Sequence, residues 1–255
     1  MINRWLSGLG LAALVSASAM WGIRATPTAE ASDDDRRSSC RGLPTASDLK
    51  KFLAAAPAAG GDAGGLFHGE RMWAAVVNRA GEICSYTTST ADPTQVWPGS
   101  QAIAKSKAYT ANAFSLDTLA LSTARLYTFT QPGHSLWSLG QSNLFNAHLL
   151  LPPSGPQTDR GDIAGGLIFF GGGVGLYRGG EIIGGLGISG DTSCTDHEIA
   201  KRVRNLADLN PPGGALVDDI VYSPPDPPSV FAHPKCINTF RNGIFIGEET
   251  PATGY

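Results

Sequence analysis

Apolar residues recur with helical spacing at the start of the folded region that the sequence predicts. Four of them fall at positions i, i+3, i+4 and i+7, on one face of a helix: Leu49, Phe52, Leu53 and Ala56. Thr45 and Asp48 precede this stripe at the spacing of a capping box, in which each side chain binds the other residue's backbone amide. The pattern predicts a helix over residues 45–56.

Shorter apolar runs predict strands. Residues 72–78 and 83–88 are separated by Asn78-Arg79-Ala80-Gly81, where Gly81 can adopt positive φ cheaply, so we expect a β-hairpin. Between Gly161 and Gly190 there are 13 glycines, and apolar runs lie among them. Gly179-Gly180 is typical of a two-residue hairpin turn. The three runs in this region predict a meander, with strands over residues 166–170, 174–178 and 181–189.

Further helices are expected over residues 100–115 and 116–129, and a last one is opened by the capping box Thr195–Glu198. Residues 130–164 form a long irregular loop, of the kind that is usually functional or lies at an interface. Strands joined by short turns must pair antiparallel. We therefore predict an α+β fold with a single antiparallel sheet of about five strands flanked by helices.

The first 31 residues are typical of a signal peptide. Arg4 precedes an apolar run rich in Gly, Ser and Ala, and Ala29-Glu30-Ala31 has the small-x-small pattern that precedes cleavage. A cut after Ala19 is the alternative. The predicted organisation is a signal peptide over residues 1–31, a domain over 32–208 and a Pro-rich tail over 209–255, with no membrane span left after cleavage and a periplasmic or secreted location.

The four cysteines, an even number, favour two disulfides in an oxidising compartment. Three pairings are possible. We favour Cys40–Cys236, which would tie the two ends of the chain together, and Cys84–Cys194 inside the domain. Cys236 is expected to pin the tail.

Composition excludes several classes of protein. A hydrophobic content of 42% excludes wholesale disorder, and a net charge of −3 argues against a nucleic-acid partner. The CxxC, HExxH, GxSxG and P-loop motifs are absent from the sequence. His134-Ser135 lacks an orienting acid of any specificity, which argues against a serine hydrolase.

Two runs could be mistaken for binding motifs. Residues 185–190 match GxGxxG, but the first glycine lies inside a predicted strand, so we interpret the glycines as packing a strand against a helix. An acidic cluster with one histidine follows: Asp191, Asp196, His197 and Glu198. Helix capping explains this cluster better than a metal site.

Three ordered segments carry a resemblance to a known family. They are AAVVNRAGEICSY (74–86), SQAIAKSKAYTANAFSLDT (100–118) and GGLIFFGGGVGLYRGGEIIGGLGISGDTSCTDHEIAKRV (165–203). Together they resemble the GlcG/HbpS-like domain family of haem-binding or haem-degradation-associated proteins, in an exported branch. The resemblance implies a profilin-like arrangement, a homo-oligomer and non-covalent haem as cofactor.

The resemblance also suggests haem-contacting residues. Lys105 and Lys107 would pair with propionates, since ammonium groups bind carboxylates through charge-assisted bonds. Tyr109 or Thr110 would supply an oxygen ligand, and Thr118 lies in the same motif. His134 is an alternative ligand, because it and His148 lie among apolar and aromatic residues in the long loop.

The leading hypothesis is an exported haem-binding accessory protein that sequesters, senses or transfers haem. It would have no catalytic cycle of its own. The alternatives are a haem-degrading or small-molecule enzyme and a structural subunit that docks onto an exported partner.

Overall fold

The computed structural model describes residues 39–223, 229–241 and 244–245. The expected signal peptide lies outside these residues. No helix within the described ranges is both long and apolar enough to cross a membrane. The described α-helices are α2 Ala46–Ala55, α3 Ser100–Phe114, α4 Leu139–Ser142 and α5 Ser193–Leu206, with 3-10 turns η1 Ala56–Ala58, η2 Pro93–Gln95, η3 Thr123–Leu126, η4 Thr128–Thr130 and η5 Ala147–Leu149. The strands are β1 Trp73–Asn78, β2 Ile83–Thr88, β3 Gly173–Arg178, β4 Glu181–Ser189 and the short β5 Val221–Tyr222, β6 Ala232–His233, β7 Phe240–Arg241 and β8 Ile244–Phe245.

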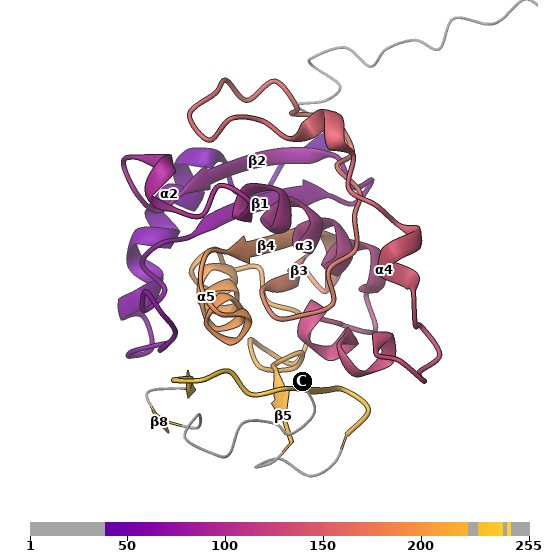
Figure 1. Ribbon diagram of the computed structural model, residues 1–255. Helices are drawn as coiled ribbons and strands as arrows, with labels where there is room; N and C mark the ends of the chain where they lie inside the picture. The colour runs from indigo at the N-terminus through magenta and orange to yellow at the C-terminus, as the bar shows by residue number, and fades with distance from the viewer. Residues whose placement is uncertain (1–38, 224–228, 242–243, 246–255) are drawn as a thin grey trace, which may run out of the picture.

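The main sheet has four antiparallel strands in the order β2-β1-β4-β3. Helix α3 covers one face, whereas α2 and α5 cover the other (Figure 1). The predicted α+β class with a single antiparallel main sheet is confirmed. Both predicted hairpins form, and Gly179 and Gly180 in the β3–β4 turn have φ of +59° and +92°.

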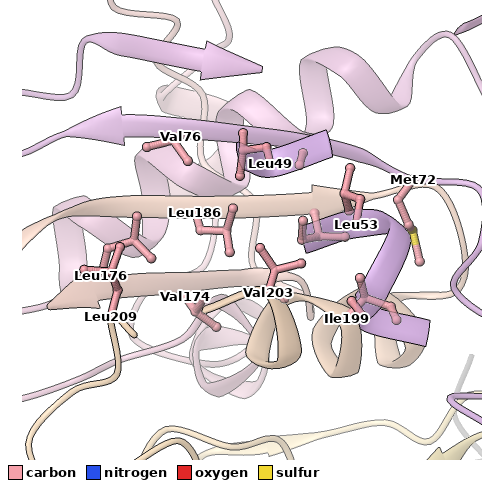
Figure 2. Packing of buried hydrophobic residues seen from close by; sticks show 14 of the residues in the cluster. Leu49, Leu53, Met72, Val76, Val174, Leu176, Leu186, Ile199, Val203 and Leu209 are labelled. Atoms are coloured by element: carbon pink, nitrogen blue, oxygen red, sulfur yellow. The ribbon is translucent and has the colours of Figure 1, made fainter. Parts of the chain in front are cut away.

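The larger hydrophobic core lies between the sheet and helices α2 and α5 (Figure 2). Leu49 and Leu53 of α2 are buried here, as the apolar stripe predicts, and Thr45 and Asp48 form the predicted capping box. Val203 of α5 packs into the same cluster. Each such side chain contributes about 1.5–3 kcal/mol when fully buried.

Glycines let α3 approach β4 closely. A Cβ at Gly185 would overlap the carbonyl oxygen of Ala108, and one at Gly187 would overlap that of Ala104. Glycine in the strand and alanine on the helix therefore bring the two backbones into contact. The interpretation of the GxGxxG run as packing is confirmed, although the helix concerned is α3.

The two edges of the sheet are covered by other parts of the chain. Along β2, the backbone of Ile83 exchanges hydrogen bonds with the loop residues Gly161 and Asp162. Along β3, Tyr177 N–H donates to the Leu209 carbonyl. Arg204 and Thr123 bind further β3 groups with their side chains.

The prediction of a helix over residues 116–129 is wrong. Leu116 and Leu119 instead form an isolated bridge, followed by the two 3-10 turns η3 and η4. The hydroxyl of Ser115 binds both the backbone N–H and the carbonyl of Leu121, and Asp117 accepts the Ile182 N–H. These side-chain bonds compete with helical hydrogen bonds, as short polar residues often do.

The strand expected over residues 166–170 is also absent. Gly165 and Gly166 have φ of +64° and +74°, which interrupts an extended chain, and the Ile168 N–H is bound by the Thr110 hydroxyl. The expected meander therefore consists of only β3 and β4. This explains why the main sheet has four strands.

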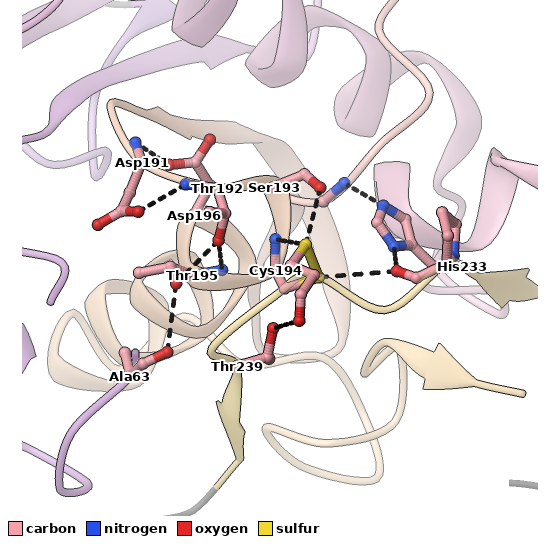
Figure 3. The surroundings of a disulfide bond; sticks show 12 residues. Ala63, Asp191, Thr192, Ser193, Cys194, Thr195, Asp196, His233 and Thr239 are labelled. Atoms are coloured by element: carbon pink, nitrogen blue, oxygen red, sulfur yellow. Dashed lines mark hydrogen bonds between the residues drawn. A yellow bond between two sulfur atoms is a disulfide. The ribbon is translucent and has the colours of Figure 1, made fainter. Parts of the chain in front are cut away.

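The favoured disulfide pairing is wrong. The bonds are Cys40–Cys84 and Cys194–Cys236. The segment before α2 runs beside β2, where the Ser85 hydroxyl donates to the Pro44 carbonyl, so Cys40 meets Cys84. Cys236 is held beside the first turn of α5, where Cys194 lies (Figure 3). Cys236 thus links the C-terminal segment to the domain.

Candidate functional site

An open groove of about 480 Å³ lies between the long loop and the chain segment that leads into β3. It is lined by Tyr127, Thr130, Gln131, Trp137, Gly140, Gln141, Leu144, Leu167, Ile168, Phe169 and Phe170. Most of these side chains are apolar or aromatic, and none carries a charge. Such a lining suits a flat, largely apolar ligand, which ligand sites typically hold against aromatic side chains.

Hydrogen bonds fix the wall of the groove formed by residues 167–170. Ile168 N–H donates to the Thr110 hydroxyl over 3.0 Å, and the Phe170 carbonyl accepts from the Thr123 hydroxyl over 2.6 Å. The Phe169 ring packs edge-on against Phe114 of α3. The wall is therefore anchored to α3 and η3.

Consecutive turns form the opposite wall. Tyr127 lies between η3 and η4, and the chain then turns back so that Leu136 N–H donates to the Phe129 carbonyl over 2.9 Å. His134 is exposed, and its backbone is hydrogen-bonded to Gln131 and Trp137, which both line the groove. Trp137 retains 51% exposure, so its indole is available to a ligand.

Lys105 lies away from solvent. Its side chain is fully buried, with Nζ 2.5 Å from Asp159 and 3.0 Å from Gln101, and 4.0 Å from the centre of the Tyr86 ring. Burial lowers the pKa of Lys105, whereas the Asp159 carboxylate raises it. The ammonium charge is thus already balanced within the protein.

Lys107 is buried behind the groove. Its Nζ lies 2.7 Å from Asp196, donates to the Ile188 carbonyl over 3.0 Å, and lies 4.8 Å from the centre of the Phe170 ring. Burial raises the pKa of Asp196 to about 6, although Lys107 opposes this shift. Of the two predicted lysines, Lys107 is the one that touches a residue of the groove.

The other predicted residues lie in different places. Thr110 is buried and supports Ile168, while Tyr109 packs over Gly81 in the β1–β2 turn. Thr118 is exposed and lines a second cavity, of about 390 Å³, with the charged residues Arg79, Asp117 and Glu181 among its walls. The structure therefore does not bring the predicted set together in one site.

The predicted capping box of the last helix is wrong. Helix α5 begins at Ser193, and the Thr192 side chain accepts from the Thr195 N–H. The Asp196 carboxylate forms an ion pair with Lys107. Glu198, which the predicted capping box would have used, lies 3.0 Å from Lys201 instead.

The acidic cluster serves other roles. The Asp191 carboxylate accepts backbone N–H groups from Leu66, Phe67 and Thr192 over 2.6–2.8 Å, so it holds a distant loop. His197 is fully buried, with Nε2 3.6 Å from Asp219. Within the described ranges, no group of three or more His, Cys, Asp or Glu residues could hold a metal ion.

Several groove residues were missed because the sequence places them in regular elements. Leu167–Phe170 reads as a strand and Tyr127 as part of a helix, so neither suggests a ligand contact. His233 does not line the groove but accepts the Gly171 N–H beside it, and it gives no signal in the sequence beyond being an isolated histidine. The one hint that the wall of residues 167–170 is irregular was its position directly after Gly165 and Gly166, which adopt positive φ.

Comparison with known proteins gives one family match. The model of the family described as haem degrading protein HbpS-like matches residues 45–204. No curated protein matches the chain.

Three solved structures are among those similar to this chain, with the following sequence identities, TM-scores and coverages. A complex of PduOC with haem is 25% identical, with a TM-score of 0.44, covering 64% of this chain and 92% of that one. Protein ORFY of Klebsiella pneumoniae is 19% identical, with a TM-score of 0.45 and coverage of 65% and 90%. A double mutant of HbpS from Streptomyces reticuli is 20% identical, with a TM-score of 0.39 and coverage of 77% and 98%.

Proposed function

Because the chain belongs to the HbpS-like family of haem degrading proteins, we propose that it is an exported accessory protein that binds haem non-covalently. The observation that carries the proposal is the open aromatic groove beside the long loop. Sequestration, sensing or transfer of haem requires a site of this kind, which holds the ligand and leaves one edge in reach of solvent.

The residues of the groove fit a porphyrin. Trp137, Phe169 and Phe170 offer aromatic surface for a flat macrocycle, and the groove has a volume of about 480 Å³. No cation is among the described residues that line it, but the groove is open, so the propionates would remain in water. We leave Lys105 and Lys107 out of the proposed contacts, because both ammonium groups are buried against carboxylates.

His134 is the side chain that we propose as iron ligand. It is exposed and lies in the turn between two lining residues, Gln131 and Trp137. Tyr127 is the alternative ligand, because it lines the groove and a phenolate can hold haem iron. When bound, haem would supply a redox-active iron with coordination positions for a protein side chain and a small exogenous ligand.

Export and assembly are part of the proposal. All four cysteines are paired in disulfides, which persist in oxidising compartments. This supports a periplasmic or secreted location. We also propose that the protein forms a homo-oligomer, as the family resemblance implies.

A haemin titration of the purified chain lacking residues 1–31 tests the function. We expect a shifted Soret band and saturation with one haemin per chain at micromolar concentrations. The His134→Ala variant should change the spectrum, and Trp137→Ala should weaken binding about 10-fold, which corresponds to about 1.4 kcal/mol. The exposed residues His148 and Trp97 provide matched controls, and their alanine variants should bind as the wild type does. Absence of a Soret shift in the wild type would overturn the proposal.

The family description favours a haem-degrading enzyme as the second candidate. The same sample decides between the two functions. Incubation of the haem-loaded protein with a reductant and air should leave the Soret band intact if the protein is an accessory binder. Progressive loss of the band with release of iron, beyond the loss seen with free haemin, would show degradation instead.

A further inference from the structure

Residues 231–236 of the C-terminal segment lie behind the groove. Residues 231–233 lie against both of its walls, and Cys236 is bonded to α5 a few residues later. We propose that His233 is a positioning residue for the groove: it holds Tyr127 on one wall and the Phe170–Gly171 backbone on the other. This inference rests on the proposed function only in that haem is taken as the ligand of the groove.

Both ring nitrogens of His233 are engaged. Nε2 accepts the Gly171 N–H over 3.2 Å, and Nδ1 lies 2.6 Å from the Pro234 carbonyl, to which it donates (Figure 3). This arrangement requires a neutral ring with its proton on Nδ1. Burial lowers the pKa of His233 to about 3, so the ring keeps this form at ordinary pH. The side chain is 2% exposed, which excludes water from these bonds.

The bond to Gly171 fixes the wall that contains Phe170. A Cβ at Gly171 would overlap the Ser193 carbonyl oxygen and lie 2.9 Å from the Cβ of His197. The backbone of Gly171 is thus clamped between α5 on one side and the His233 imidazole on the other. Phe170, the preceding residue, has little freedom to move as a result.

The opposite wall is held by ring contacts. The His233 ring centre lies 5.2 Å from that of Tyr127, within the range of favourable aromatic pairs. Two neighbouring contacts also join the C-terminal segment to this wall. Phe231 packs edge-on against Phe129 at 5.6 Å, and the Thr128 hydroxyl donates to the Ala232 carbonyl over 2.7 Å. One imidazole therefore joins the two walls across the back of the groove.

Two substitutions separate the two contacts. His233→Gln retains an acceptor for Gly171 but removes the ring, whereas His233→Phe retains a ring beside Tyr127 but removes the acceptor. Amide hydrogen exchange of the ligand-free protein reports local opening in each wall. We expect His233→Phe to accelerate exchange about 10-fold at residues 168–171 and His233→Gln to do so at residues 127–131. His233→Ala should accelerate both.

Haemin affinity provides the second readout, with an expected loss of about 10-fold in His233→Ala and a smaller loss in the other two variants. The matched control is His68→Ala, which removes an exposed histidine paired with Asp62 away from the groove. If His233→Ala does not fold, the Gln and Phe variants still decide the question. Unchanged exchange in both walls, or equal acceleration throughout the sheet, would overturn the positioning role. The exchange data need no haem, so a wild type that fails to bind haemin would overturn only the proposed function.

Discussion

Lys107 and Asp196 form a buried ion pair in which Nζ lies 2.7 Å from Oδ2. The pair joins the middle of α3 to the first turn of α5, and the Lys107 ammonium also binds the Ile188 carbonyl at the end of β4. It therefore connects elements on opposite faces of the sheet. The Lys107 ammonium also lies against the ring of Phe170, which lines the groove. The ion pair is therefore located directly behind the groove.

Removing one partner of this pair should be costly. We expect Lys107→Met to lower the free energy of unfolding by about 3–5 kcal/mol, because the Asp196 carboxylate is then left buried without its counter-charge. Urea unfolding at pH 7 measures this. Lys51→Met is the matched control, since the Lys51–Asp48 pair is largely exposed and should contribute less than about 1 kcal/mol. A loss equal to that of the control would contradict the importance of the buried pair.

Gly187 should not tolerate a side chain. Gly187→Ala places a methyl group against the Ala104 carbonyl, so we expect a loss of about 3 kcal/mol as α3 is forced away from β4. Gly99→Ala is the control, because no atom of the described residues lies within 4 Å of its Cβ position and the change should stay within about 0.5 kcal/mol. Thermal unfolding of the two variants tests the comparison, and equal melting temperatures would show that the interface can relax.

The two disulfides should have similar effects on stability and different effects on the groove. They close loops of nearly equal length, with sequence separations of 44 and 42 residues, and each should contribute about 2–5 kcal/mol. Replacing Cys194 and Cys236 by serine should also weaken haemin binding, since it releases the segment behind the groove. Replacing Cys40 and Cys84 should leave affinity unchanged. Non-reducing peptide mapping checks the pairing, and equal affinities in the two double variants would contradict this prediction.

His233 should make stability depend on pH. Its pKa is about 3 in the folded protein and 6.5 in the reference state, so the unfolded chain binds the extra proton between these values. The stability that neutral His233 contributes is therefore fully present above pH 6.5 and is lost as the pH falls towards 3. The slope amounts to about 1.4 kcal/mol per pH unit at most. His233→Gln should flatten the curve of unfolding free energy against pH in this window, whereas a curve parallel to that of the wild type would rule out the assignment.

Features set by neighbours in the chain were predictable from sequence. The capping box of Thr45 and Asp48 and the turn at Gly179-Gly180 depend on a few adjacent residues, and both form as expected. Gly187 was also interpreted correctly, because glycine inside an apolar strand usually marks a close approach of another backbone.

Features set by distant contacts were not predictable. The disulfide pairing depends on which segment lies beside β2, and nothing in the spacing of the cysteines reveals it. Burial of Lys105 depends on Asp159, which lies 54 residues away in the loop. A lysine on an amphipathic helix is normally solvated, so local pattern alone gives the wrong environment for it.

The covered edges of the sheet restrict how copies of the protein can assemble. Loop residues 161–162 occupy backbone groups of β2, and Leu209 with the Arg204 and Thr123 side chains does the same for β3. Exposed strand edges are otherwise templates for strand addition and aggregation. These contacts hinder the pairing of a second copy with either edge strand, so the homo-oligomer proposed above would be built from side chains of helices and loops. Its interfaces would then depend on specific surface residues, and the fold itself is protected against open-ended growth.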